Sequence, residues 1–381
     1  MNEYLYQKHN QFFSQYAYGS AKAAKDELIE LGAKNIKDGY LGYYFQIKIN
    51  DLYKLVYLSR ISTRILAPIS SFDCHSEKYL YKTAKNINWE NFLTVNKTFS
   101  ITANVSNSNI KNSKYASYIL KDAIVDQFRE NKKLRPNVNT RFPDLLLNLY
   151  IHENKARISI DLGGGSLHKR GYRKSNNDAP MKENLAATII DYVQWDKKTP
   201  IYDPFCGSGT LLIEAAIKYT QTPASLLRQK FGFLRLPEFN PEIWNKEKTH
   251  YNKQIKNLPS DLIQGSDIDN DVIQKAKDNI NSFKNFSSIH IENKDFKNIE
   301  KLNDKLIITN PPYGIRQNSI EEATLLLSMF GDFLKHKCTG STAFVYFGNK
   351  EIIKKIGLKP DLKIPINTGK LPGFLCRYPI Y

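Results

Sequence analysis

The sequence has few cysteines, comparatively few acidic residues and no long run of apolar residues. Its four cysteines are scattered singly over 381 residues, with no Cys-x-x-Cys pair and no histidine at the spacing of a zinc site. This pattern argues against a disulfide framework and against a structural metal. The longest apolar runs span a handful of residues, far below the roughly 20 that a membrane-spanning helix needs. We therefore expect no metal ion and no membrane contact.

The composition indicates a folded chain with a polyanionic partner. Residues 1–13 lack the apolar stretch of a secretory signal peptide, so we expect a cytoplasmic protein. A hydrophobic content of 41% excludes a largely disordered chain, and the length predicts two or three domains. Asp and Glu number 38 against 55 Lys and Arg, a formal net charge of +17. Nucleic acid is the commonest partner of such a chain, although a biased composition or a solvated lysine surface also explains the charge.

The first 65 residues predict a small α/β unit. Apolar periodicity indicates strands at 11–15 and 43–49, helices at 21–31 and 52–58, and an extended segment at 63–68. The order β-α-β-β-α-β is typical of a ferredoxin-like unit.

Residues 66–165 predict a second, α+β unit, followed by a basic linker at 166–180. A strong strand pattern at 98–105 precedes an amphipathic helix at 114–130 and a hairpin at 144–161. Basic residues gather around this helix and in the linker, and we expect them to bind RNA: Lys111, Lys114, Lys121, Lys132, Lys133, Arg135, Lys169, Arg170 and Arg173.

The remaining segment, 181–381, alternates strands and helices. A helix at 182–195 precedes a strand at 200–203, a glycine-rich turn and a helix at 210–220. Such alternation predicts a doubly wound, mainly parallel sheet of the Rossmann type. The polar, lysine-rich stretch 221–259 interrupts the order, and we expect it to be an insertion.

The turn at 203–210, Asp-Pro-Phe-Cys-Gly-Ser-Gly-Thr, has the composition of a cofactor loop. Gly207 and Gly209 allow the backbone to approach a ligand, and the following helix offers unpaired N–H groups. An ordinary tight turn is the alternative. No Lys-Ser/Thr pair follows the glycines, so the segment is not a P-loop. Cys206 is better explained as a small turn residue than as a nucleophile.

Acidic residues follow the next two strands. Asp267 is placed to accept hydrogen bonds from both hydroxyls of a ribose, whereas Asp269 is expected to cap the following helix. Asp295 could accept a hydrogen bond from an adenine amino group, and the Phe296 ring could pack against the purine. Taken singly, Asp295 would be an ordinary loop acid.

The sequence Asn-Pro-Pro-Tyr-Gly at 310–314 directly follows an apolar strand. The Asn310 amide oxygen and the Pro311 carbonyl can both accept N–H bonds from the exocyclic amine of a nucleobase. Tyr313 can stack on that base, and Pro311 and Pro312 stiffen the loop. A proline-stiffened loop without a ligand is the alternative.

Together these motifs resemble class I S-adenosylmethionine-dependent methyltransferases that modify amino groups. The resemblance implies that Asn310, Pro311, Pro312 and Tyr313 form the catalytic site around the target amine. It also implies a set of residues that bind S-adenosylmethionine: Asp203, Phe205, Cys206, Gly207, Ser208, Gly209, Thr210, Asp267, Ile268, Asp295, Phe296 and Asn310.

The junction at 161–173 closely resembles that of THUMP-domain RNA methyltransferases, best the bacterial 23S rRNA guanine-N2 methyltransferase family. The resemblance implies a ferredoxin-like unit (1–65) and a THUMP domain (66–165) before the catalytic domain (181–381). It implies methyl transfer to the exocyclic N2 amine of a guanine in structured RNA, with rRNA as the expected substrate. The sequence departs from the family at Gly165, where an acid is usual. Some members continue into a second methyltransferase domain, which we do not expect in a chain that stops at Tyr381.

Other functions remain open at this point. An Asn-Pro-Pro-Tyr segment suits adenine N6 as well as guanine N2, so an adenine-N6 methyltransferase acting on DNA or RNA is one alternative. A tRNA guanine-N2 methyltransferase and a non-catalytic RNA-binding assembly factor are two others.

Overall fold

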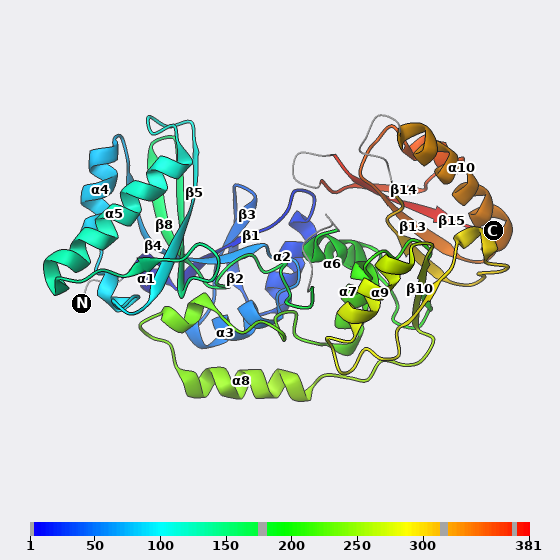
Figure 1. Ribbon diagram of the computed structural model, residues 1–381, viewed down its shortest axis with the longest axis horizontal. Helices are drawn as coiled ribbons and strands as arrows, with labels where there is room; N and C mark the ends of the chain where they lie inside the picture. The colour runs from blue at the N-terminus through cyan, green and yellow to red at the C-terminus, as the bar shows by residue number, and fades with distance from the viewer. Residues whose placement is uncertain (1–3, 174–180, 313–318, 368–371) are drawn as a thin grey trace.

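The computed structural model describes residues 4–173, 181–312, 319–367 and 372–381, which form two sheets of different topology (Figure 1). The N-terminal half of the chain builds an eight-stranded sheet, and the C-terminal half builds a seven-stranded one. In Figure 1 the two lie at opposite ends of the molecule, with α2, α6 and α7 between them.

The first unit has the predicted ferredoxin-like order. Its strands are arranged β2-β3-β1-β4, and each neighbouring pair is antiparallel. After the short helix α1 (Leu5–His9) the elements are β1 (Gln11–Gln15), α2 (Ala21–Glu30), β2 (Lys34–Gly39), β3 (Gly42–Gln46), α3 (Ile49–Leu58) and β4 (Arg64–Asp73). The sequence assigned no residues to β2, whose side chains are mostly exposed and therefore carry no apolar alternation.

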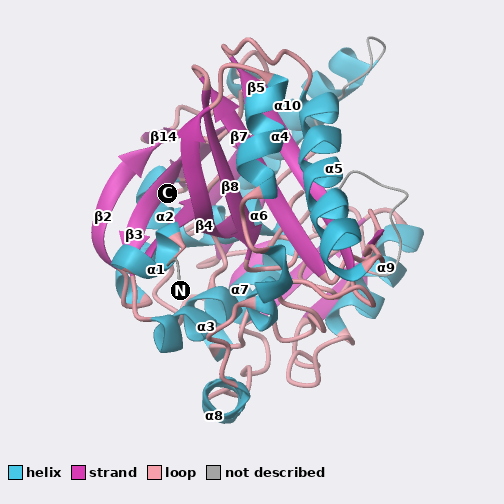
Figure 2. Cartoon of the chain, turned by 90° about the vertical axis from the view of Figure 1, so that its left-hand side faces the viewer, coloured by secondary structure: helices cyan, strands magenta, loops and turns pink. Residues whose placement is uncertain are grey.

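The second unit extends the same sheet. Residues 64–66 of β4 pair with β1, and residues 66–73 pair with β8. The predicted boundary between 65 and 66 thus falls inside one strand that both units share. The elements are α4 (Glu77–Lys85), η1 (Trp89–Asn91), β5 (Thr98–Ser106), α5 (Ser113–Lys132), β6 (Asn137–Val138), β7 (Leu145–His152) and β8 (Lys155–Asp161). Figure 2 shows α4 and α5 side by side on one face of this sheet.

The C-terminal sheet is doubly wound, as predicted. Its order is β11-β10-β9-β12-β13-β15-β14: the first five strands are parallel, β15 is antiparallel to β13, and β14 is antiparallel to β15. The strands are β9 (Ile201–Asp203), β10 (Ile263–Asp267), β11 (His290–Asn293), β12 (Leu306–Thr309), β13 (Thr342–Phe347), β14 (Leu362–Pro365) and β15 (Phe374–Pro379). The helical elements are α6 (Glu183–Tyr192), α7 (Thr210–Thr220), α9 (Asn270–Ile280), η3 (Phe296–Asn298), α10 (Ser319–Lys337) and η4 (Ile353–Ile356).

The strand order reverses between β9 and β12, because β10 and β11 lie to one side of β9 and the later strands to the other. In an open α/β sheet, ligands bind outside the carboxyl ends of the strands at such a switch point. A ligand is therefore expected beside the residues that follow β9, β10 and β12.

The stretch 221–259 packs onto the N-terminal half. It contains η2 (Gly232–Arg235) and α8 (Pro241–Lys253), which runs below α3 in Figure 1. The Trp244 ring lies 5.2 Å from that of Tyr57, and the Phe233 ring lies 5.1 Å from that of Tyr53. These apolar contacts tie the C-terminal half of the chain to the ferredoxin-like unit.

Two further properties concern the described residues alone. None of their helices is long and apolar enough to cross a bilayer, and none of their His, Cys, Asp and Glu side chains form a cluster of three or more that could hold a metal ion. All four cysteines are buried and free.

Candidate active site

Asp203, the last residue of β9, links the glycine-rich loop to β12. Its Oδ1 accepts a hydrogen bond from the Phe205 amide (3.1 Å) and another from the Thr309 hydroxyl (2.6 Å). The side chain is buried, and this burial raises the pKa of Asp203 to about 7, with a smaller contribution from Asp267. Asp203 therefore fixes the loop beside the end of β12, where Asn310 follows.

The glycine-rich loop presents open backbone toward the end of the sheet. Gly207 and Gly209 have φ angles of +53° and +79°, in the left-handed region that favours glycine. A Cβ atom on Gly207 would meet no described atom within 4 Å, so the loop surface there is free for a ligand. Ser208 is fixed by a hydrogen bond that the Asn279 side-chain amide donates to its carbonyl (3.0 Å).

Asp267, at the end of β10, contacts this loop directly. Its Oδ2 accepts a hydrogen bond from the Gly207 amide (2.9 Å), and its Oδ1 accepts one from the Asp269 amide (3.1 Å). Asp269 caps α9 through the amides of Asp271 and Val272, which confirms its predicted role. The structure thus brings Asp267 and Gly207 together across 60 residues of sequence. Ile268 beside them is 70% exposed.

Asp295 and Phe296, which follow β11, make contacts within the protein. Asp295 caps η3 by accepting from the Lys297 amide (3.0 Å). Phe296 is only 3% exposed, and its ring packs 5.0 Å from that of Phe205 and 5.6 Å from that of Phe330. These aromatic neighbours cover the ring, so we remove Phe296 from the expected purine contacts. The exposed Ile268 offers apolar surface in its place.

Cys206 fits its interpretation as a turn residue. Its side chain is buried, and burial, with the nearby charge of Asp203, raises the pKa of its thiol well above the ordinary value. A thiol that stays protonated is a poor nucleophile.

Asn310, directly after β12, carries the most informative feature of the site. Its Oδ1 is buried and has no hydrogen-bond partner among the described residues. Leaving such an acceptor unpaired costs about 1–3 kcal/mol, and these groups are rare in folded proteins. Pro311 is buried and Pro312 is exposed, whereas Tyr313 lies outside the described residues. The orphan acceptor marks a position that a donor from a ligand can satisfy.

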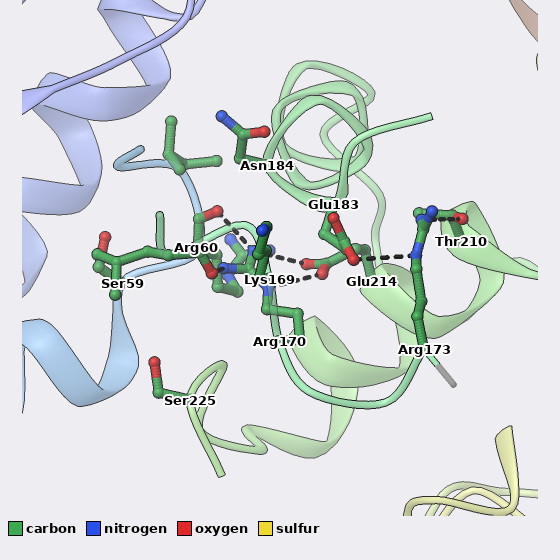
Figure 3. Close-up of polar contacts among 12 residues, drawn as sticks. Ser59, Arg60, Lys169, Arg170, Arg173, Glu183, Asn184, Thr210, Glu214 and Ser225 are labelled. Atoms are coloured by element: carbon green, nitrogen blue, oxygen red, sulfur yellow. Dashed lines mark hydrogen bonds and ion pairs between the residues drawn. The ribbon is translucent and has the colours of Figure 1, made fainter. Parts of the chain in front are cut away.

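The two arginines of the linker turn inward (Figure 3). Arg170 is fully buried: its Nε donates to Glu214 on α7 (3.0 Å), and its guanidinium also donates to the Leu167 and Arg60 carbonyls (2.8 and 2.6 Å). The prediction that Arg170 contacts RNA is therefore wrong, because its charge is neutralised inside the protein. Figure 3 shows it bridging the N-terminal unit and α7.

Arg173 braces the start of the same helix. Its guanidinium donates to the Thr210 hydroxyl and to the Met181 carbonyl, both at 2.8 Å, and lies 3.0 Å from Glu183. These contacts occupy the side chain, so its predicted RNA contact is also withdrawn. Arg173 instead holds the first turn of α7, which directly follows the glycine-rich loop.

The other predicted RNA-binding residues lie at the surface. Lys121 is partly exposed and pairs with Asp122 (2.5 Å), and Lys132 pairs with Glu90 (2.9 Å). The exposed members of the set are Lys111, Lys114, Lys132, Lys133, Arg135 and Lys169. Their contact with RNA remains a prediction.

Sequence reasoning missed the residues that support the site from a distance. Thr309 reaches Asp203 across 106 residues, and Asn279 reaches Ser208 across 71. Only the direct succession of Thr309 and Asn310 hinted at the first contact. The roles of Arg170 and Arg173 had no local signal, because basic residues in a linker usually face solvent.

Two regions of the chain match known protein families. Residues 170–376 match the model of the RMKL-like methyltransferase domain, and residues 74–161 match that of the THUMP domain. The chain belongs to the RMKL-like methyltransferase family. The methyltransferase match covers both cofactor-loop and Asn-Pro-Pro-Tyr segments, and the THUMP match covers α4, α5 and the strands beside them.

Relatives of this methyltransferase are similar over nearly all of its length. The chain is 34% identical over 371 residues to slr0064 of Synechocystis sp., named as an RNA methyltransferase, and covers 97% of that protein. It is 35% identical over 362 residues to the ribosomal RNA large subunit methyltransferase K/L of Aliivibrio salmonicida. That match covers 93% of this chain but 51% of the relative, so the chain spans about half the length of the K/L proteins.

Solved structures agree with the fold. The crystal structure of SMU.472, assigned as a methyltransferase and complexed with SAH, has a TM-score of 0.84 at 24% identity. A protein of Clostridium difficile 630 described as a possible methylase also has a TM-score of 0.84, at 26% identity. Each match covers 97% of this chain and 98% of the other, so the arrangement of both sheets is shared.

Proposed function

We propose that this methyltransferase transfers a methyl group from S-adenosylmethionine to the exocyclic N2 amine of a guanine in 23S rRNA. The observation that carries the proposal is the buried Asn310 Oδ1 without a described partner, held at the strand switch point beside the glycine-rich loop. The THUMP domain and the K/L relatives support rRNA as the substrate.

The residues around the loop fit S-adenosylmethionine, which supplies a methyl group on a positively charged sulfonium. Each Asp267 oxygen accepts one backbone N–H and keeps a lone pair for a ribose hydroxyl. The open surface at Gly207 allows close approach of the cofactor, and Ile268 offers apolar contact to its purine. In this proposal Asp295 accepts a hydrogen bond from the adenine amine.

Asn310 and Pro311 orient the target amine. The Asn310 Oδ1 and the Pro311 carbonyl each accept one N–H of the guanine N2 group, which leaves the nitrogen lone pair free to face the methyl group. The fixed φ angles of Pro311 and Pro312 hold both acceptors in place before the base arrives. Asn310 is a neutral amide and cannot act as a general base, so the proton leaves to water and positioning supplies the main rate enhancement.

Nucleoside analysis of a methylated RNA tests the proposal. Unmodified 23S rRNA is incubated with the full-length protein and isotopically labelled S-adenosylmethionine, then digested and analysed by mass spectrometry, with total tRNA and DNA as parallel substrates. We expect labelled N2-methylguanosine from 23S rRNA. Labelled N6-methyladenosine, or labelling of tRNA or DNA alone, would replace the proposed target with one of the alternatives.

The matched variants are Asn310→Ala and Asn245→Ala. Asn245 is exposed on α8 and is not part of the candidate active site. Its replacement should leave the labelling unchanged. Asn310→Ala should remove it. The absence of any label with the wild-type protein on every substrate would favour the non-catalytic alternative.

A further inference from the structure

A cavity of about 440 Å³ lies on the eight-stranded sheet, away from the candidate active site. It is lined by side chains of β1, β3, β4, β5, β7 and β8 and of the turn between β2 and β3. Side chains alternate across a strand, and on β7 Leu147 and Leu149 enter the core with the apolar face of α5. Asn148 and Tyr150, which lie between and beyond them, therefore line the cavity on the opposite face.

The strand register gathers aromatic and basic groups in this cavity. Tyr150 pairs directly with Arg157 on β8 and with Asn104 on β5, so the three side chains share one face. The Arg157 guanidinium lies 4.8 Å from the centre of the Tyr44 ring and donates to the Tyr44 hydroxyl. Tyr40, in the turn at the rim, is 76% exposed. Flat rings thus stand beside one cation on the face of the sheet opposite α5.

The polar groups of the cavity are poised for a ligand. The Arg157 Nε is buried without a hydrogen-bond partner among the described residues. Asn148 and Ser159 are only 4% and 2% exposed, yet both line the cavity. The described lining residues include Arg157 as a cation and no carboxylate. A ligand with a flat ring, edge donors and acceptors, and negative charge matches this lining.

We propose that this cavity binds one unpaired nucleotide of the RNA substrate, with the base stacked on Tyr150 and the phosphate near Arg157. The proposal rests on the proposed RNA substrate and adds a second contact point, distant in sequence from Asn310. A duplex hides the faces of its bases, so only an unpaired base can stack on an aromatic side chain. The volume falls within the roughly 300–1,000 Å³ of small-ligand pockets.

Binding of short RNA by the full-length protein tests this proposal. The probe is a fluorescein-labelled, mixed-sequence RNA of about ten nucleotides, measured by anisotropy both as a single strand and annealed to its complement. We expect Tyr150→Ala to weaken single-strand binding at least about fivefold, equivalent to ~1 kcal/mol at ~1.4 kcal/mol per tenfold, and to leave duplex binding unchanged.

Two further variants separate stacking from general damage. Tyr150→Phe keeps the ring and should bind the single strand nearly as well as the wild type. Tyr79→Ala removes an exposed tyrosine from α4 and should leave both affinities unchanged. Equal loss of single-strand and duplex binding in Tyr150→Ala, or no loss, would overturn the nucleotide site.

This outcome is distinguishable from failure of the proposed function. If the wild type methylates rRNA and Tyr150→Ala binds the single strand normally, the cavity assignment is wrong and the activity stands. If no RNA is methylated but the single strand binds through Tyr150, the activity is wrong and the cavity assignment stands.

Discussion

At the scale of single residues, the candidate site is built from the ends of parallel strands. Sequence patterns could locate Asp203, Asp267 and Asn310, because each lies at the end of a short segment that is predicted to be a strand. They could not reveal that Thr309 donates to Asp203, since that contact depends on β9 and β12 being neighbours. They also predicted that Phe296 contacts a ligand, whereas its ring packs against those of Phe205 and Phe330.

The first prediction concerns Asn310. Asn310→Ala should lower methyl transfer at least about 100-fold, because it removes one of two acceptors that orient the amine, while S-adenosylmethionine affinity stays within a few fold. Asn310→Asp, which keeps an acceptor at the same place, should retain more activity than the alanine variant. Turnover measured with saturating cofactor, beside calorimetric cofactor binding, checks both. Wild-type turnover in a folded Asn310→Ala protein would contradict the assigned role.

The second prediction uses the raised pKa of Asp203. A pKa raised from 3.8 to about 7 means that folding favours the protonated carboxyl. The stability this provides is complete below about pH 4 and is lost as pH rises toward 7, up to about 4 kcal/mol at ~1.4 kcal/mol per pH unit. Asp203→Asn keeps the acceptor for Phe205 and Thr309 but cannot ionise, so the variant does not lose this stability as the pH rises.

The free energy of unfolding in urea, measured from about pH 4 to pH 8, checks this expectation. The Asp203→Asn variant should be more stable than the wild type by a few kcal/mol at about pH 8, and the gap should close near pH 4. Asp332→Asn, an exposed control on α10, should show no such trend. A gap that does not depend on pH would mean that Asp203 is ionised in the fold.

At the scale of elements, α7 is the piece that the linker holds in position. Arg173 contacts its first residue, Thr210, and Arg170 pairs with Glu214 one turn later, so both arginines act on one face of the helix (Figure 3). The sequence predicted α7 correctly but placed both arginines on RNA. A basic run shows its charge and not its direction, and here the buried Glu214 draws Arg170 inward.

The third prediction tests the buried pair. Arg170→Met should destabilise the protein by about 3–5 kcal/mol, because Glu214 is left as an uncompensated buried charge. The double variant Arg170→Met, Glu214→Leu should be more stable than the sum of the two single changes by ~2 kcal/mol or more. Urea unfolding of the wild type, Arg170→Met, Glu214→Leu and the double variant gives this coupling energy. Additive changes would show that the two side chains do not stabilise each other.

At the scale of the whole molecule, the parts of the chain are joined more closely than the sequence indicated. The shared strand β4 merges two of them into one sheet, and Trp244 from the catalytic half packs on Tyr57 of the first unit. Local periodicity contains neither fact, because pairing between distant strands and the docking of an insertion depend on tertiary contacts. Residues 1–175 alone would lack that aromatic contact, so RNA binding is best tested on the full chain.

The last prediction concerns the charge of the full chain. The formal charge of +17 has two explanations, a bound polyanion or a solvated surface, and salt dependence separates them. Phosphate contacts release counterions, so log affinity for rRNA fragments should fall linearly with log salt. Replacing the exposed Lys111, Lys114 and Arg135 by alanine should reduce the slope by about one per lost contact.

The matched control removes three exposed lysines from the methyltransferase half, Lys337, Lys354 and Lys355. Both variants carry the same net charge, so an affinity that depends on overall charge alone would respond equally to both. We expect the first variant to lose affinity and slope, and the second to keep both close to those of the wild type. Equal responses would show that affinity follows the overall charge, and the segment around α5 would then have no special part in holding RNA.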